Sequence, residues 1–275
     1  MAGIFNLFRK KKMEGKEEEP EASDSKSDKV PGSEKNDYID ISAKGSGPGD
    51  GSENDEESSR GKLIVIEGND GSGKRTQIDL LADRLGKKLE IEVLDFPDYG
   101  SFYGKLIKRY LSGEFGKQVN PYLIAMAYAN DRLTKREKMM KWLNAGKTVI
   151  CNRYVASNKA HQAVKLGTAA EMQDFVKWVD EMEYEVNALP RPDITIYLYV
   201  PVDIAIGLVQ QRADKTQTKT DIHEKLSYMK KVEQIYLAMS KNKNWIRIDC
   251  VEGEEILTKD EIHGKVYNIV KNQLI

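Results

Sequence analysis

The residues best suited to chemistry are three glycines and a lysine in the stretch GNDGSGK, residues 68–74. Gly68, Gly71 and Gly73 allow the backbone to turn tightly with its N–H groups facing inward. Lys74 adds a full positive charge where a helix would begin, and the helix N-terminus adds a partial one. This spacing, GxxxxGK, is that of a loop that binds phosphate groups. The alternative is an ordinary turn between a strand and a helix.

The segments on either side of this loop favour the phosphate-binding interpretation. Residues 63–66, LIVI, are consecutive apolar residues, as expected of a strand that is buried on both faces of a parallel sheet. Ile78, Leu81 and Leu85 then follow at helical spacing. One residue departs from the usual pattern, because Arg75 stands where Ser or Thr commonly supplies a hydroxyl to Mg²⁺.

Composition indicates one soluble globular domain with a less ordered extension. The chain has 275 residues, of which 40% are hydrophobic and 32% charged. Its two cysteines, Cys151 and Cys250, have no metal-ligand spacing and are expected to be reduced thiols in a cytoplasmic protein. No apolar run approaches the ~20 residues that a membrane-spanning helix needs. The small positive surplus of the chain after residue 60 suits phosphate-bearing small molecules and requires no nucleic-acid partner.

Residues 1–60 are predicted to be a disordered extension of the domain formed by residues 61–275. They are rich in Glu, Ser, Asp, Lys and Gly, and from residue 13 onwards they almost lack large apolar side chains. Residues 1–12 differ, because apolar residues precede the basic run RKKK. That segment could make a weak contact with an anionic membrane surface or a partner, or it could be a disordered basic end.

Beyond the loop, the hydrophobic pattern alternates between strand and helix spacing. Strands are predicted at residues 63–66, 90–95, 147–151, 194–200 and 245–249, and helices at 74–87, 102–111, 121–144, 155–166, 168–187, from about 201 to Arg212, 221–241 and near the C-terminus. Strands separated by helices predict an α/β fold, with a five-stranded parallel sheet and helices on both faces. Ligands of such sheets bind beyond the carboxyl ends of the strands.

Four motifs, three of them at these strand ends, resemble those of thymidylate kinases, which are P-loop nucleoside monophosphate kinases. The motifs are EGNDGSGKRTQ, FPDY, AYANDR and NRYVASNKAHQ, and the resemblance covers residues 62–275. It implies an enzyme, a dTMP kinase that transfers the γ-phosphoryl group of ATP to dTMP with Mg²⁺ as cofactor. Charge neutralisation and alignment are then the main catalytic tasks. The family is usually dimeric, so a homodimer is expected.

The resemblance implies a donor site in the glycine-rich loop. Lys74 would hold the β- and γ-phosphates, and Asp70 would lie between donor and acceptor. Asp70 and Asn152 would contact the metal ion, which is held largely through nucleotide phosphates and water. The ATP-binding residues would be Gly68, Asn69, Asp70, Gly71, Ser72, Gly73, Lys74, Arg75 and Thr76.

For the acceptor, the resemblance assigns one residue to the phosphate and several to the nucleoside. Arg153 would bind the acceptor phosphate with its planar fork, although it could pair with a carboxylate instead. Tyr128 would stack on thymine, or could be helix core. His161 would lie near the sugar, or could be a surface histidine. The dTMP-binding residues would be Phe96, Pro97, Tyr128, Arg132, Arg153, Asn158 and His161, with Arg132 at the carbonyl edge of the base.

A lid over the site is implied between Arg212 and about residue 221. Arg212, Lys215 and Lys219 would supply positive charge to the transition state, the alternative being a solvated charged loop. Arg212 thus joins Lys74, Arg153 and Asp70 in the predicted catalytic set. Asn152, in place of the acidic residue of the family's DRY motif, keeps two alternatives open: a kinase of another monophosphate such as dUMP, and a nucleotide-binding regulator with little turnover.

Overall fold

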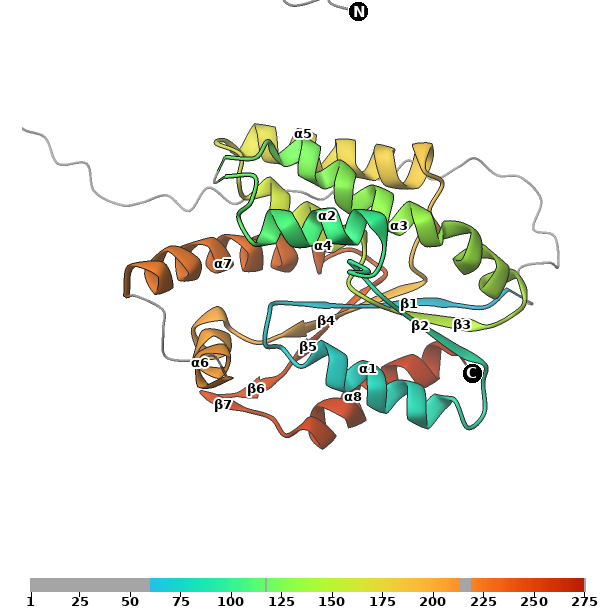
Figure 1. The fold of residues 1–275 in the computed structure, drawn as a ribbon. Coiled ribbons are helices and arrows are strands. Elements are labelled where there is room, and N and C mark those ends of the chain that lie inside the picture. Colours follow the sequence, from blue (N-terminus) through green and yellow to red (C-terminus); the bar gives the residue numbers. More distant parts are fainter. Residues whose placement is uncertain (1–59, 117, 213–218, 275) are drawn as a thin grey trace, which may run out of the picture. The chain divides into compact units, whose positions relative to one another are not determined.

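The centre of the fold is a parallel sheet of five strands, drawn edge-on in Figure 1. The computed structural model describes residues 60–116, 118–212 and 219–274, and it gives only the backbone of residues 208–212 and 219–224. The strands are β1 (Leu63–Gly68), β2 (Ile91–Asp95), β3 (Thr148–Asn152), β4 (Ile194–Tyr199) and β5 (Trp245–Asp249). Their order in the sheet is β2-β3-β1-β4-β5. The predicted five-stranded parallel sheet is therefore confirmed.

Helices cover both faces of this sheet. On one face, α1 (Lys74–Leu85) packs against α8 (Lys259–Leu274). The other face carries five helices (Figure 1): α2 (Phe102–Leu111), α3 (Pro121–Asn144), α4 (Val155–Ala163), α5 (Ala169–Asp180) and α7 (Lys219–Met239). The remaining helix, α6 (Val202–Arg212), follows β4. No helix of the described residues is long and apolar enough to cross a membrane.

Two parts of the predicted element list are wrong. The helix expected over residues 168–187 ends at Asp180 and continues as a π-helix, η2 (Glu181–Val186). A two-stranded antiparallel hairpin, β6 (Val251–Glu252) with β7 (Glu255–Ile256), lies between β5 and α8 and was not expected. Strands of two residues are too short to show an alternating pattern, and one turn of wider helix does not change the apolar spacing enough to be seen.

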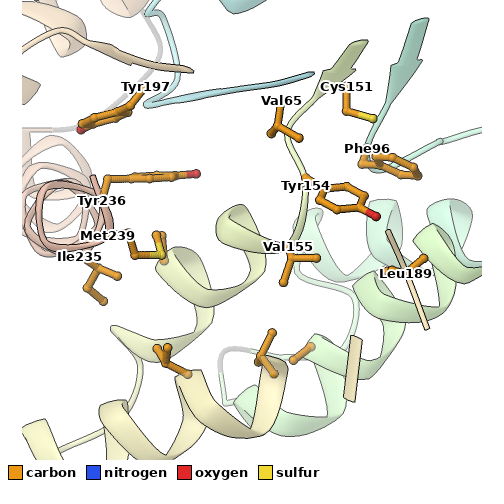
Figure 2. Packing of buried hydrophobic residues seen from close by; sticks show 14 of the residues in the cluster. Val65, Phe96, Cys151, Tyr154, Val155, Leu189, Tyr197, Ile235, Tyr236 and Met239 are labelled. Atoms are coloured by element: carbon orange, nitrogen blue, oxygen red, sulfur yellow. The ribbon is translucent and has the colours of Figure 1, made fainter. Parts of the chain in front are cut away.

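The core consists mainly of two clusters, one on each face of the sheet. Leu63 and Val65 of β1 point into the first cluster, whereas Ile64 and Ile66 point into the second. Successive side chains of a strand alternate between faces, so a strand buried on both sides must be apolar throughout. Figure 2 shows part of the first cluster, between the sheet and helices α4, α5 and α7.

This topology brings three strand ends to one edge of the sheet. β1 lies between β3 and β4, and β3 lies between β1 and β2. The strand ends Gly68, Asp95 and Asn152 are therefore adjacent, and the loops after them carry the phosphate-binding glycines, the FPDY motif and the NRY motif. The tail prediction for residues 1–60 lies outside the described residues, apart from Arg60.

Candidate active site

The loop between β1 and α1 has the backbone geometry that a phosphate-binding loop requires. Gly68 has φ 155° and Gly73, which precedes α1, has φ 81°. A Cβ atom at Gly68 would lie 2.8 Å from the carbonyl oxygen of Leu198, so only glycine fits there. The loop is thereby held against β4, and the N-terminus of α1, which favours anions, follows it directly.

Lys74 is folded onto the loop in this structure. Its side chain is buried, and its Nζ donates to the carbonyl oxygens of Gly68 at 2.9 Å and Asn69 at 2.8 Å. Burial and the neighbouring charge of Arg153 lower the pKa of Lys74 to about 7. An incoming phosphate would supply the negative charge that favours the protonated amine.

Polar atoms in the loop and next to it lack partners among the described residues. Both side-chain amide atoms of Asn69, the hydroxyl of Ser72 and Oδ1 of Asn152 are buried without a hydrogen bond to any described group. Burying polar groups unpaired costs free energy, so such atoms point to a ligand or water that satisfies them. Their place beside Lys74 fits a nucleotide phosphate and its metal ion.

Arg75 does not face the phosphate position. Its Nε lies 2.9 Å from Oδ1 of Asp79, and its Nη1 pairs with Asp95. The other oxygen of Asp95 accepts from Nδ2 of Asn152 at 2.7 Å. Thr76 is exposed on α1. Two residues that depart from the family pattern, Arg75 and Asn152, are thus joined through one carboxylate at the end of β2.

The described residues contain no group of three or more histidine, cysteine, aspartate or glutamate side chains able to hold a metal ion. The two predicted metal contacts, Asp70 and Asn152, are each tied to another side chain. What Asn152 offers is its unpaired Oδ1, a neutral carbonyl oxygen of the kind that Mg²⁺ or its water accepts. This donor set fits a metal ion held mostly by nucleotide phosphates.

A cavity of about 580 Å³ opens beside the loop and collects all seven predicted acceptor residues. It extends from apolar walls between β2 and α3 to charged groups at the ends of β1 and β3. Its lining comprises Asp70, Phe96, Pro97, Tyr99, Tyr110, Leu111, Tyr128, Arg132, Arg153, Ser157, Asn158, His161, Gln162, Lys165, Lys225, Tyr228 and Met229. The structure thus brings together the predicted acceptor residues, which extend over 65 positions of the sequence from Phe96 to His161.

At the apolar end of the cavity, Arg132 is held by a carboxylate. Arg132 is 1% exposed, and its Nε and Nη2 lie 2.5 and 2.6 Å from the two oxygens of Glu183. Asn158 also donates to Glu183, at 2.9 Å. Glu183 therefore fixes Arg132 and Asn158, the two polar side chains that line this end of the cavity. Glu183 lies on η2 and was not predicted as a site residue.

The charged end of the cavity is centred on Arg153. Its Nη2 lies 2.5 Å from Oδ1 of Asp70, and its Nη1 donates to Oγ of Ser157 at 3.0 Å. Burial would raise the pKa of Asp70, but the positive charges of Arg153 and Lys74 lower it to about 2, so the carboxylate is ionised. The sequence left two roles for Arg153, binding of the acceptor phosphate and pairing with a carboxylate. In this structure Arg153 pairs with a carboxylate, and it also lines the acceptor cavity.

His161 and Tyr128 both line the cavity. His161 is not a free surface residue: Nε2 lies 3.4 Å from Arg153 Nη1, and Nδ1 lies 3.1 Å from the hydroxyl of Tyr228. Burial and the charge of Arg153 lower the pKa of His161 to about 3, so its ring is neutral at physiological pH. Tyr128 is half-buried and packs against a small core cluster formed by Ile107, Ile124 and Ala127, so it belongs to the core as well as to the cavity wall.

Residues missed from the sequence hold Arg153 in place. Glu67, the last residue but one of β1, is fully buried and accepts hydrogen bonds from Ser157 and Tyr236. A charged residue inside the run LIVIEG was a signal that could have marked Glu67, because isolated charges are rare in buried strands. Tyr236 carried no comparable signal, since it occupies an apolar position of α7.

The predicted lid lies outside the described residues. This applies to all of residues 213–218, including Lys215, and to the side chains of Arg212 and Lys219. Their roles stay predictions.

Comparison with known proteins identifies the family. The family model for thymidylate kinase matches residues 66–262. The chain belongs to the thymidylate kinase family. A probable thymidylate kinase of Methanocaldococcus jannaschii is 31% identical over 210 residues, which is 76% of this chain and 96% of the relative. The thymidylate kinase of Schizosaccharomyces pombe is 30% identical over 214 residues, 78% of this chain and 93% of the relative.

Among solved structures, the thymidylate kinase of Candida albicans has the same fold. It superposes with a TM-score of 0.62 at 23% sequence identity, over 78% of this chain and 92% of that one. Family membership confirms the predicted enzyme class, a thymidylate kinase, and the fold comparison confirms the sheet with its surrounding helices. The roles of individual residues stay predictions that rest on the geometry described above.

Proposed function

We propose that this thymidylate kinase family member transfers the γ-phosphoryl group of ATP to dTMP, forming dTDP and ADP in the synthesis of dTTP. One observation carries the assignment of the acceptor: a single cavity beside a phosphate-binding loop is lined both by the aromatic side chains of Phe96 and Tyr128 and by Arg153. A planar apolar group and a dianionic phosphate are the two parts of a nucleoside monophosphate. The names of the relatives in two organisms support thymine as the base.

In the proposed reaction, the chain's residues neutralise and align two anions. Lys74 leaves the loop carbonyls and binds the β- and γ-phosphates of ATP together with the loop N–H groups. Arg153 binds the acceptor phosphate with a two-pronged contact, for which its fork is suited. Asp70 lies between the two sites and holds Arg153 before substrate arrives. No general base is needed, because the acceptor phosphate is already ionised.

Mg²⁺ is the proposed cofactor; the phosphates of ATP would hold it, and Oδ1 of Asn152 would contribute through water. The metal ion, when bound, neutralises charge on the transferring phosphoryl group. Asp95 orients Asn152, since a carboxylate can only accept and therefore faces the Nδ2 of the amide. Oδ1 is thus turned away from Asp95.

The nucleoside is proposed to lie between the apolar walls of the cavity. Phe96 and Tyr128 offer ring surfaces for the base, a contact of about 1–3 kcal/mol by analogy with stacking in single-stranded nucleic-acid sites. Arg132 offers a donor to the carbonyl edge of the base, and Asn158 offers its unpaired Oδ1 as an acceptor for a base N–H. Both side chains are positioned by Glu183. Arg212 and the lysines that follow it are proposed to add positive charge to the transition state from the lid.

A homodimer is proposed from an apolar strip on α2 and α3. Phe102 is 78% exposed, Leu123 60% and Met126 38%, and α2 packs against α3. Large exposed apolar side chains on neighbouring helices commonly mark a protein interface. Light scattering on Leu123→Glu should show a monomer if this strip is the interface. A cytoplasmic location and a weak surface contact of residues 1–12 stay predictions.

The proposed function is tested by measuring ADP production with ATP, Mg²⁺ and one acceptor at a time. The acceptors are dTMP, dUMP, dCMP, UMP and none. Turnover that strongly favours dTMP supports the proposal, whereas a preference for dUMP would show that dUMP is the acceptor instead. Binding of ATP and dTMP without turnover would identify a nucleotide-binding regulator and overturn the kinase assignment.

A further inference from the structure

A buried carboxylate lies directly behind Arg153. Glu67 is 0% exposed and accepts from the backbone N–H groups of Tyr154 at 2.8 Å and Ser157 at 3.2 Å. Two hydroxyls also donate to its Oε2, that of Ser157 at 2.7 Å and that of Tyr236 at 2.9 Å. Four neutral donors therefore surround the charge, which is the condition for burying a carboxylate without a cation in direct contact.

The same two hydroxyls connect this carboxylate to the guanidinium of Arg153. Nη1 of Arg153 lies 3.0 Å from Oγ of Ser157 and 3.5 Å from the hydroxyl oxygen of Tyr236. Each hydroxyl has one proton and two lone pairs, so it can donate to Glu67 and accept from Arg153 at once. The hydroxyls thus transmit the orientation of Glu67 to the side chain that faces the cavity.

The backbone of Arg153 makes such support necessary. Its φ is 64°, a left-handed conformation that costs a residue other than glycine about 1–3 kcal/mol and persists only where the surroundings impose it. Its N–H donates to the carbonyl oxygen of Ile66 at 3.0 Å, and the next N–H, of Tyr154, donates to Glu67. Two successive residues of β1 therefore hold the backbone around Arg153.

Tyr236 reaches this network from the far side of the core. It belongs to α7, and its ring stacks on that of Tyr197 in β4, with centroids 5.2 Å apart and planes at 17°. Figure 2 shows that the two hydroxyls point in opposite directions. The hydroxyl of Tyr197 has no hydrogen-bond partner among the described residues, whereas that of Tyr236 donates to Glu67 and lies 2.9 Å from Oγ of Ser157. Tyr236 does not line the cavity.

From this geometry we infer that Tyr236 is a positioning residue for the acceptor phosphate. Its hydroxyl, with Glu67 and Ser157, holds the guanidinium of Arg153 where the phosphate of dTMP binds. The inference rests on the proposed role of Arg153. It predicts that loss of the hydroxyl affects phosphate recognition alone, because Tyr236 does not line the cavity and its ring, which meets that of His161 edge-on, is kept in phenylalanine.

The test compares Tyr236→Phe with Tyr197→Phe in the full-length protein. Both changes remove one buried hydroxyl from the same ring stack, so the second is a matched control for packing. Calorimetric affinities for dTMP and for thymidine separate the phosphate from the nucleoside. Tyr236→Phe should weaken the affinity for dTMP about tenfold and leave the affinity for thymidine within about twofold. A tenfold loss is the size expected when one hydrogen bond to a charged network is removed. Tyr197→Phe should leave both affinities unchanged.

Two further variants keep the outcomes distinguishable. Glu67→Gln should show the same selective loss of dTMP affinity, and it replaces the tyrosine variant if that one does not fold. Arg153→Ala tests the proposed role of Arg153 in binding the acceptor phosphate, because this variant must also lose more affinity for dTMP than for thymidine. If Arg153→Ala is selective but Tyr236→Phe weakens both ligands equally or neither, Tyr236 is not a positioning residue. If Arg153→Ala is not selective, the acceptor-phosphate assignment itself is wrong.

Discussion

Asp70 and Arg153 form an ion pair, with Oδ1 and Nη2 2.5 Å apart, at the point where the phosphate-binding loop meets the acceptor cavity. The two residues are 83 positions apart and lie at the ends of neighbouring strands, β1 and β3. The pair keeps the guanidinium in place before substrate arrives. An incoming phosphate dianion must therefore compete with Asp70 for Arg153 or share the arginine with it.

Removal of the guanidinium should nearly abolish turnover. Arg153→Ala is expected to lower kcat/KM for dTMP by about 10³-fold or more, since a cation that neutralises the reacting phosphates in the transition state contributes on that scale. The measurement is steady-state ADP production with dTMP. Arg247→Ala is the control, because Arg247 is exposed and, among the described residues, forms its ion pair with Asp249, so its loss should leave the rate unchanged. A milder loss for Arg153→Ala would show that Arg153 does not contact the reacting groups.

Binding of ATP should take up a proton through Lys74. The pKa of Lys74 is lowered to about 7, so at pH 8 most of the free protein carries the neutral amine. The phosphates of ATP favour the charged form, so close to one proton should be bound per ATP at pH 8. Calorimetry in buffers of different ionisation enthalpy measures this uptake. Lys74→Met should abolish it, and uptake that persists in that variant would assign the proton to another group.

The same lowered pKa predicts how stability depends on pH without nucleotide. Between about pH 7 and the ordinary pKa of lysine near 10.4, the unfolded chain binds more protons at this residue than the folded protein. The contribution of Lys74 to the free energy of unfolding therefore rises with pH across this range. Urea titrations at pH 7 and pH 9 measure the free energy of unfolding of the natural protein and of Lys74→Met. From pH 7 to pH 9 this free energy should rise less, or fall more, in the variant than in the natural protein. Equal pH dependence in both would contradict the lowered pKa.

Restoring the family's aspartate at position 152 should destabilise this chain. Nδ2 of Asn152 donates to Asp95 at 2.7 Å, so Asn152→Asp replaces a hydrogen bond by two facing carboxylates. Their repulsion at this distance is about 1–2 kcal/mol even in water-like surroundings, and thermal unfolding should occur at a lower temperature. The double variant Asn152→Asp with Asp95→Asn exchanges donor and acceptor and should recover most of the loss. No recovery would show that the two positions are not coupled.

Loss of Glu183 should cost far more stability than loss of its near neighbour Glu185. Glu183→Ala leaves the charge of Arg132 buried and unpaired, which is expected to cost about 3–5 kcal/mol. Glu185 pairs with Arg191 on the surface, where both side chains are more than 60% exposed, so Glu185→Ala should cost at most about 1 kcal/mol. Chemical denaturation measures both. Similar values for the two variants would show that Arg132 does not depend on Glu183.

Local pattern alone determined the element order and the position of the phosphate-binding loop. The run LIVI, the spacing GxxxxGK and the helix period after Lys74 lie within about 25 residues of one another, so neighbours in sequence are sufficient to express them. The same reasoning failed at η2 and at the hairpin β6–β7, because these segments contain too few residues for a period to be detected. Four motifs, three at strand ends and one within α3, carried the family resemblance and contain most residues of the cavity.

Only the tertiary structure decided which of these side chains meet, and through which partners. The strand order places β1 beside both β3 and β4, and this order is what brings Asp70 to Arg153. Glu67 and Tyr236 are 169 residues apart, and nothing in the sequence near either one indicates the other. Such pairs depend on the register of strands and the angle at which α7 packs on the sheet. These are properties of the whole core, which no local pattern encodes.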